Sequence, residues 1–349
     1  MGWTLLTVAI VCAHYYHYDV QPERARLALT DPVLHHVFAA GNPENNRTAV
    51  VDLAGLGNVD ATDTARALPS LAQLGQVWAV QYDNAGLDTA VISRLITKRA
   101  HRAAVSRIVV VGHSMGGIIA LEVADHIYQD TELELQAVIL DCTPINMHAV
   151  RAQSRNAGED MLRWMGWLPG ARESRALRLL VETVARKDRF ITPSAEGLPL
   201  VDLPNLYGVV NEVVREKLLS DTAASNGLIQ SQFIAIVASG AHNNLEALTS
   251  RSTSKQLPAF VLLRPDMGTD DPIVNVDYTQ RALFDQTGGP RGRLLVVRMA
   301  PTGHANPMQQ PQAYNAAIAT TVSPFLSRLD RRDNANSASR AAHLGSAPS

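Results

Sequence analysis

The sequence predicts an α/β fold, in which helices flank a mostly parallel central sheet and a helical cap is inserted between two parts of the core. Three observations lead to this prediction. Short runs of apolar β-formers alternate with segments of helical periodicity, which is typical of a parallel sheet. The alternation stops at about residue 146 and resumes at about residue 256. One stretch, "RIVVVGHSMGGIIALEVA" at 107–124, passes from a strand to a helix within very few residues.

The overall composition limits the size of the fold and the classes of partner. A chain of 349 residues that is 46% hydrophobic suffices for one large α/β domain with an insertion, or for two smaller domains. Its formal charge of −2 gives no indication of a nucleic-acid partner. Cys12 and Cys142 are the two cysteines, and they offer neither a disulfide framework nor metal-ligand spacing. We therefore expect no nucleic acid, no metal and no cofactor.

The first part of the predicted core covers residues 31–145. It contains four apolar strand segments, "TAVVDL", "GQVWAVQYD", "RIVVV" and "LQAVILDCTP". Residues 87–104 have apolar side chains at helical spacing. Residues 1–30 are assigned to an N-terminal hydrophobic segment and a connector, and the polar stretch 19–48 is expected to hold at most one short helix.

The second part of the predicted core covers residues 256–328, and the cap lies between the two parts at 146–255. The cap sequence contains several helical stretches and few strand signals. After it, "PAFVLLRPD" and "RLLVVRMAP" resume the strands, and helices fit 275–286 and 310–327. Residues 329–349 contain few large apolar side chains and are predicted to be a disordered tail.

The N-terminal segment allows two interpretations. "WTLLTVAIVCA" is uncharged and apolar, but it is shorter than the ~20 residues of a comfortable membrane span, and it lacks the basic region of a secretory signal. Trp3 at one end and Tyr15, Tyr16 and Tyr18 at the other are placed as interfacial aromatic residues would be. A membrane anchor or signal, with membrane contact through this segment, and a first strand or packed helix both stay open. The localisation, whether membrane-associated, secreted or cytoplasmic, stays open with them.

The strand-to-helix stretch has the features of a nucleophile elbow. The β-branched run before Gly112 predicts a buried parallel strand, and the apolar residues after Gly117 suit a helix packed on a sheet. A turn this tight crowds its central residue, so Gly112 and Gly116 supply small neighbours on both sides. The bend pushes the Ser114 hydroxyl out of the sheet at the start of a helix, which is the G-x-S-x-G pattern.

A serine nucleophile needs a base and a group that orients the base. His304 follows the last predicted strand, on a loop opened by Gly303. Parallel strands of one sheet end at the same edge, so this loop and Ser114 are expected to be neighbours. His113 is adjacent to the serine, but neighbouring residues on a sharp bend point apart.

The orienting acid is expected in the loop after "PAFVLLRPD", the strand segment between the elbow and the last strand, and this loop offers Asp266, Asp270 and Asp271. We choose Asp271, because the apolar segment 272–274 that follows it would hold the carboxylate in place. Asp270 is a close alternative, and Asp141, after the preceding strand, is a rarer one.

The oxyanion of the tetrahedral intermediate needs two N–H donors. The Met115 N–H, just after the nucleophile, is predicted to be one of them. The second is expected from the loop Ala54–Gly57 after the "TAVVDL" strand, where we favour the Leu56 N–H and place Gly55 next. An ordinary glycine turn is the alternative interpretation of this loop.

The cap contains a cluster of large apolar residues in "MLRWMGWLPG" at 161–170. On a helix, Met161, Trp164 and Met165 share one face. If that face overhangs Ser114, Trp164 and Met165 line a pocket for an acyl chain or an aromatic ester. The alternative is that these residues only attach the cap to the core.

These motifs resemble those of the α/β-hydrolase superfamily, in which nucleophile, acid and base follow in the order Ser114, Asp271, His304. The resemblance covers 48–145 and 256–328. Within the superfamily, "DLAGLGN" and "VQYDNAGLD" are similar to a bacterial group with an A-G-L-G oxyanion loop. The His-Gly pair common in that loop is Ala-Gly here. The resemblance implies cleavage of an ester, thioester, amide or lactone, and less often acyl transfer or cofactor-free chemistry.

We therefore predict a serine hydrolase that cleaves carboxylic esters, with a small-molecule ester, its acyl group apolar, as substrate. An acyltransferase with the same triad is one alternative. A non-catalytic binding protein of the same fold is another, but it predicts an incomplete triad. Epoxide hydrolases and dehalogenases need a carboxylate at the elbow, where this chain has Ser114.

Overall fold

A seven-stranded sheet forms the centre of the computed structural model, which describes residues 2–192, 199–220, 222–238, 240–250, 255–289 and 292–345. The strand order is β1-β3-β2-β4-β5-β8-β9, and every neighbouring pair is parallel except β1 and β3. The strands are β1 Val33–Phe38, β2 Thr48–Leu53, β3 Gln76–Gln81, β4 Arg107–His113, β5 Glu134–Asp141, β8 Ala259–Pro265 and β9 Leu294–Met299. The predicted mostly parallel sheet is confirmed.

The register of the central strands sets the position of the elbow. Leu53 of β2 pairs with Gly112 of β4, and His113 pairs with Asp141 of β5. The residue after β4 therefore leaves the sheet where β2 and β5 also end. Every residue of β2 and β8 is buried, as continuous apolar runs in a sheet covered on both faces should be.

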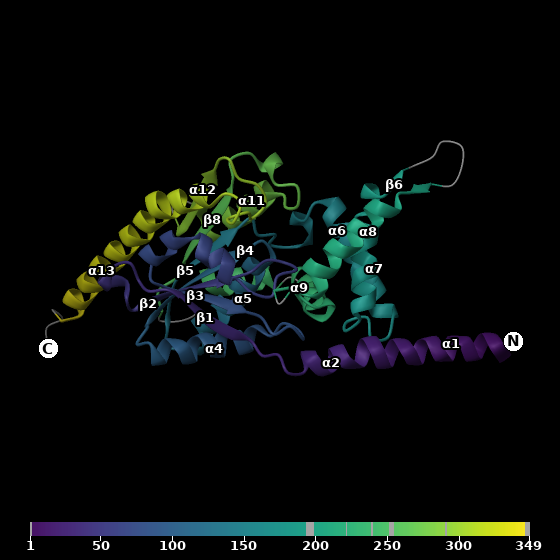
Figure 1. Cartoon of the computed structure of the whole chain (residues 1–349). Helices are drawn as coiled ribbons and strands as arrows, with labels where there is room; N and C mark the ends of the chain where they lie inside the picture. The colour runs from purple at the N-terminus through teal and green to yellow at the C-terminus, as the bar shows by residue number, and fades with distance from the viewer. Residues whose placement is uncertain are drawn as a thin grey trace.

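Helices cover both faces of the sheet (Figure 1). The central one, α5, begins directly after the elbow and packs on β4 and β5. The helices of this layered core are α3 Thr62–Ala67, α4 Thr89–Arg102, α5 Met115–Asp130, α11 Val276–Thr287, α12 Pro311–Ala317 and α13 Ser323–Gly345. The edge strand β1 was not predicted, because the connector assigned to 19–48 contains it. Its two histidines and its partly exposed side chains suit a sheet edge.

The cap lies to one side of the sheet, opposite the C-terminal helix (Figure 1). It consists of α6 Ala152–Trp167, α7 Arg175–Ala185, α8 Leu203–Val213 and the short strands β6 Ile191–Thr192 and β7 Leu200–Val201. The helices α9 Asn226–Ala238 and α10 Ala241–Thr249 pack on α5, and their residues Leu228 and Leu245 belong to the main core. The predicted cap boundary at 255 is therefore too late, because α9 and α10 pack on the core through their apolar faces.

The N-terminal segment is helical, so the interpretation as a first strand is wrong. It runs through α1 Gly2–Tyr15, a π-helical turn at Tyr16–Val20 and α2 Gln21–Leu27. In Figure 1, α1 extends away from the rest of the molecule, and most of its large apolar side chains are exposed. Within the described part of the chain, no helix combines the length and the apolar character needed to cross a membrane.

One carboxylate joins the N-terminal helices to the cap. Asp19 accepts a hydrogen bond from the Ser174 hydroxyl and another, of 3.0 Å, from the Arg175 N–H at the start of α7. An acidic side chain at a helix N-terminus satisfies free N–H groups and interacts favourably with the helix dipole. Val20, beside it, is fully buried. The cap is thus attached to the segment that precedes the sheet.

The predicted disorder of 329–349 is wrong over most of its length, because α13 extends to Gly345. The first half of α13 is held against the core by two aspartates, and composition alone does not predict these contacts. The Asp330 carboxylate accepts hydrogen bonds from Arg107 at 3.1 Å and Gln136 at 2.8 Å, and Asp333 accepts one from Arg293 at 2.7 Å. Residues 346–349 of the predicted tail lie outside the described residues.

Candidate active site

Ser114 occupies the sharp turn between β4 and α5. Its φ of 54° lies in the left-handed region, which non-glycine residues rarely adopt. The turn leaves no room for a side chain two residues before the serine or two residues after it. A Cβ atom added at Gly112 would lie 2.3 Å from the Gly116 carbonyl oxygen, and one added at Gly116 would lie 2.5 Å from the Ala54 carbonyl oxygen. The two glycines of the motif are therefore required by the backbone itself.

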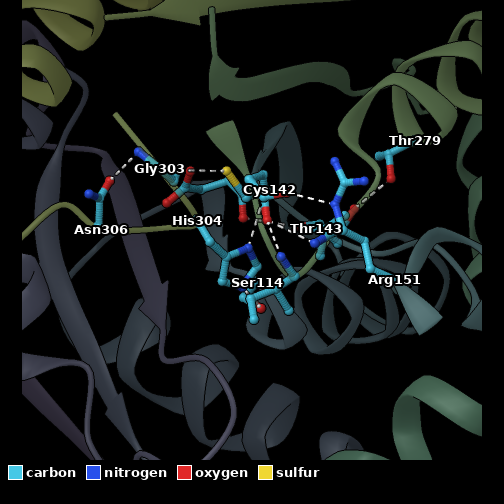
Figure 2. Close-up of polar contacts among 12 residues, drawn as sticks. Ser114, Cys142, Thr143, Arg151, Thr279, Gly303, His304 and Asn306 are labelled. Carbon is cyan, nitrogen blue, oxygen red and sulfur yellow. Dashed lines mark hydrogen bonds and ion pairs between the residues drawn. The ribbon is translucent and has the colours of Figure 1, made fainter. Parts of the chain in front are cut away.

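The structure brings Ser114, His304 and Asp271 together. His304 Nε2 lies 2.8 Å from Ser114 Oγ, and His304 Nδ1 lies 2.9 Å from Asp271 Oδ2. Figure 2 shows the His304 ring between Ser114 and the loop at Gly303. The histidine follows β9, the acid follows β8 and the serine follows β4, so all three stand at the same edge of the sheet.

The surroundings of Asp271 distinguish it from the alternative acids Asp270 and Asp141. Its second oxygen, Oδ1, accepts the N–H groups of Ile273 at 2.9 Å and Val274 at 2.8 Å, and its side chain is fully buried. These two backbone donors satisfy the second oxygen of a buried carboxylate. Asp270 is exposed, and the Asp141 side chain bonds His113 instead of His304.

Arg151 holds the loop that carries Asp271, a role that was not predicted from the sequence. Its Nε donates to the Asp271 carbonyl oxygen at 2.7 Å, and its Nη2 donates to the Gly268 carbonyl oxygen at 2.7 Å. Figure 2 shows the guanidinium on the side of the site opposite Gly303. Since Arg151 lies 120 positions from Asp271, no local pattern relates the two residues.

The loop after β2 passes beside the serine, where the second oxyanion donor was expected. A Cβ atom added at Gly55 would lie 3.5 Å from Ser114 Cβ. The Gly57 N–H is already used, since it donates to Gln232 Oε1 at 2.9 Å. Tyr82, fully buried, donates its hydroxyl to the Ala54 carbonyl oxygen at 2.9 Å and so fixes the peptide plane that precedes Gly55.

The two predicted donors stand on the two backbone segments that border Ser114. Met115 is the first residue of α5, and the first N–H groups of a helix have no acceptor within it. Leu56 lies on the loop after β2, next to Gly55. Their role in binding an oxyanion stays a prediction.

Cys142 lies beside the triad. Ligand-type atoms of Cys142, Asp271 and His304 lie within 4.8 Å of one another, a spacing that metal ligands also show. Burial raises the pKa of the Cys142 thiol well above its ordinary value. The thiol donates to the Gly303 carbonyl oxygen at 3.5 Å and connects the end of β5 to the histidine loop (Figure 2).

The two residues predicted to line an acyl pocket have different environments. Met165 is buried, with 9% of its surface exposed, whereas Trp164 is 65% exposed. In the same helix, a Cβ atom added at Gly158 would lie 1.9 Å from the Phe233 ring, so α6 packs closely on α9. Met161, on the same face of α6, packs against the main core, and the pocket stays a prediction.

Comparisons with known proteins bear on the family and the fold. The alpha/beta hydrolase family matches residues 14–317. Among solved structures, a monoacylglycerol lipase of Paleococcus ferrophilus superposes with a TM-score of 0.50 at 14% identity, covering 84% of this chain and 99% of the other. An esterase of Exiguobacterium antarcticum superposes with a TM-score of 0.49 at 15% identity, covering 85% and 96%. No curated protein matches the sequence.

At these identities the solved structures bear on the fold alone. The family match extends over most of the chain, and the sheet order and helix layers agree with it. The chain therefore belongs to the alpha/beta hydrolase family.

Proposed function

We propose that the protein is a serine hydrolase that cleaves carboxylic esters through an acyl-enzyme on Ser114. One observation carries the proposal: a continuous hydrogen-bonded series from the Ser114 hydroxyl through His304 to the buried Asp271 carboxylate. The series joins a nucleophile, a base and an orienting acid at one edge of the sheet. The substrate is a small-molecule ester, and we expect its acyl group to be apolar.

In the proposed reaction, Ser114 Oγ attacks the ester carbonyl carbon while His304 Nε2 takes the hydroxyl proton. The N–H groups of Met115 and Leu56 bind the oxyanion of the tetrahedral intermediate. Asp271 stabilises the imidazolium that forms and holds the Nδ1 proton toward itself. His304 then gives its proton to the leaving alkoxide. Water attacks the acyl-enzyme with His304 again as base, which releases the acid and restores Ser114.

Acyl transfer is the second candidate, because an alcohol in place of water completes the same cycle without any other change. Adding alcohols at saturating concentration and measuring transesters against free acid separates the two. The complete hydrogen-bonded triad disfavours a non-catalytic binding protein.

The Ser114→Ala variant tests the central proposal. We expect hydrolysis of nitrophenyl esters to fall by roughly 10⁴–10⁶-fold, as in other triads. Labelling by a fluorophosphonate probe should be lost, while the thermal unfolding midpoint stays close to that of the wild type. Activity within tenfold of the wild type would contradict the serine-hydrolase proposal.

Three Asp→Asn variants identify the acid. Asp271→Asn presents His304 with the wrong protonation pattern and should cost about 10⁴-fold in kcat. Asp270→Asn should leave kcat nearly unchanged, because this side chain is exposed. Asp141→Asn should lower the unfolding midpoint more than the other two, since it weakens a buried ion pair with His113. A large kcat loss in Asp270→Asn alone would move the acid by one residue.

The pocket prediction is tested by Trp164→Ala and Met165→Ala with esters of increasing acyl length. If Trp164 contacts the acyl chain, its loss should reduce kcat/KM by ~10–200-fold for long chains and leave acetate unchanged. Met165→Ala is the matched packing control and should lower the unfolding midpoint, since this side chain is buried. A uniform loss across chain lengths in Trp164→Ala would remove Trp164 from the pocket.

We propose in addition that α1 contacts a lipid surface. Trp3 is 85% exposed and Leu5 is 68% exposed on a helix without charged side chains. Vesicle co-sedimentation of a Leu5→Glu/Ile10→Glu variant tests this. Leu29→Glu is the control, because Leu29 is more exposed than either residue but lies outside α1. Losing roughly 1.5–3 kcal/mol per side chain should release the double variant from vesicles. Equal sedimentation of both variants, or a wild type that self-associates without lipid, would contradict the proposal.

A further inference from the structure

A second aspartate–histidine pair lies behind the nucleophile. His113, the residue before Ser114, points into the core, where its Nδ1 donates to Asp141 Oδ2 at 2.8 Å. Its Nε2 lies 3.0 Å from Asp52 Oδ1, an ion-pair contact without hydrogen-bond alignment. Both carboxylates are fully buried, and the histidine is nearly so. The catalytic mechanism uses none of these three groups.

The charge state of this pair follows from its neighbours. Burial by itself lowers the pKa of His113, but the opposing charges of Asp52 and Asp141 outweigh it and raise that pKa to about 10. His113 is therefore an imidazolium at neutral pH, and both of its ring nitrogens are donors. The Asp141 side chain accepts the hydrogen bond from Nδ1.

Tyr314 connects this pair to the loop that carries the catalytic histidine. Its hydroxyl donates to Asp141 Oδ1 at 3.0 Å and accepts the Asn306 N–H at 3.1 Å. The Asn306 side chain in turn accepts the Gly303 N–H at 3.1 Å (Figure 2), so the bonded residues lie before and after His304 in the sequence. The Tyr314 ring is fully buried in α12.

Asp141 also holds the serine. Its carbonyl oxygen accepts the Ser114 N–H at 2.7 Å, while its side chain accepts the Tyr314 hydroxyl. Nucleophile and base thus share one residue as their common support. The loop needs such support, because Ala305, directly after the histidine, has a φ of 38°, in the region that non-glycine residues avoid.

We propose that Tyr314 is a positioning residue for His304, and that its hydroxyl, bound to Asp141, sets the distance between His304 Nε2 and Ser114 Oγ. The proposal rests on the serine-hydrolase function argued above. Without the hydroxyl, Asp141 Oδ1 loses a donor and the Asn306 N–H loses its acceptor. The loop then relaxes, and the histidine leaves the geometry needed for proton transfer. Substrate binding depends on other groups and stays unchanged.

The experiment compares Tyr314→Phe with Tyr128→Phe in the full-length chain. Both tyrosines are fully buried, but the Tyr128 hydroxyl donates at 3.5 Å to the Lys255 carbonyl oxygen, near the far end of α5 from the elbow. The measurements are kcat and KM for a nitrophenyl ester, the rate of Ser114 labelling by a fluorophosphonate, and the unfolding midpoint. Assays run well below the lower of the two midpoints.

For Tyr314→Phe we expect kcat and the labelling rate to fall by about 10- to 100-fold, with KM within twofold of the wild type. Tyr128→Phe should keep both rates, whatever its midpoint. If Tyr314→Phe does not fold, Asn306→Ala replaces it. That variant removes only the acceptor of the Gly303 N–H in a half-buried loop, and it should lower kcat in the same way.

Two results would overturn the proposal. One is a Tyr314→Phe enzyme, or its Asn306→Ala substitute, with wild-type kcat; the other is a kcat loss in Tyr128→Phe that matches the loss in Tyr314→Phe. Either would mean that the hydroxyl serves general stability only. Failure of the serine-hydrolase function is a different outcome, because the wild-type protein would then show no activity that depends on Ser114.

Discussion

The close approach of two backbone segments at the turn from β4 into α5 is the constraint on which the other parts depend. Gly116 has no Cβ, so the carbonyl oxygens of Leu53 and Ala54 can reach its Cα from the end of β2. This contact fixes the loop after β2 against the start of α5, and with it the space in which an ester carbonyl would sit. The sheet register then places the acid and histidine loops around that space.

Buried charge is concentrated at the same edge of the sheet. Asp52, Asp141 and Asp271 each end or follow a strand, and all three are fully buried. Burying three carboxylates is costly unless each has donors or an opposite charge. Asp271 has two backbone N–H groups and His304, while Asp52 and Asp141 share the charge of His113. Asp271 is thus paired with His304, the proposed base, and the other two carboxylates are paired with His113.

Local spacing was enough to predict the strands β2 to β5, β8 and β9, the tight turn at Ser114, and the proximity of Ser114 and His304 at one edge of the sheet. The choice between Asp271 and Asp270 depends on which side chain is buried. Burial is set by parts of the chain that are distant in the sequence, so the local sequence does not reveal it. Arg151 and Tyr314 escaped prediction for the same reason: their partners lie 120 and 173 positions away. The contacts of Asp330 and Asp333 in the predicted tail could not be predicted, because their arginine partners lie 223 and 40 positions away.

The bond between Asp19 and Ser174 has a consequence for the order in which the chain is made. The two residues are 155 positions apart, and a ribosome adds roughly 5–20 residues per second. The apolar α1 is thus outside the ribosome for on the order of 8–30 s before its partner in the cap exists. During that interval nothing in the cap can position it. A chaperone or targeting factor that binds apolar helices would therefore meet α1 before the rest of this protein does.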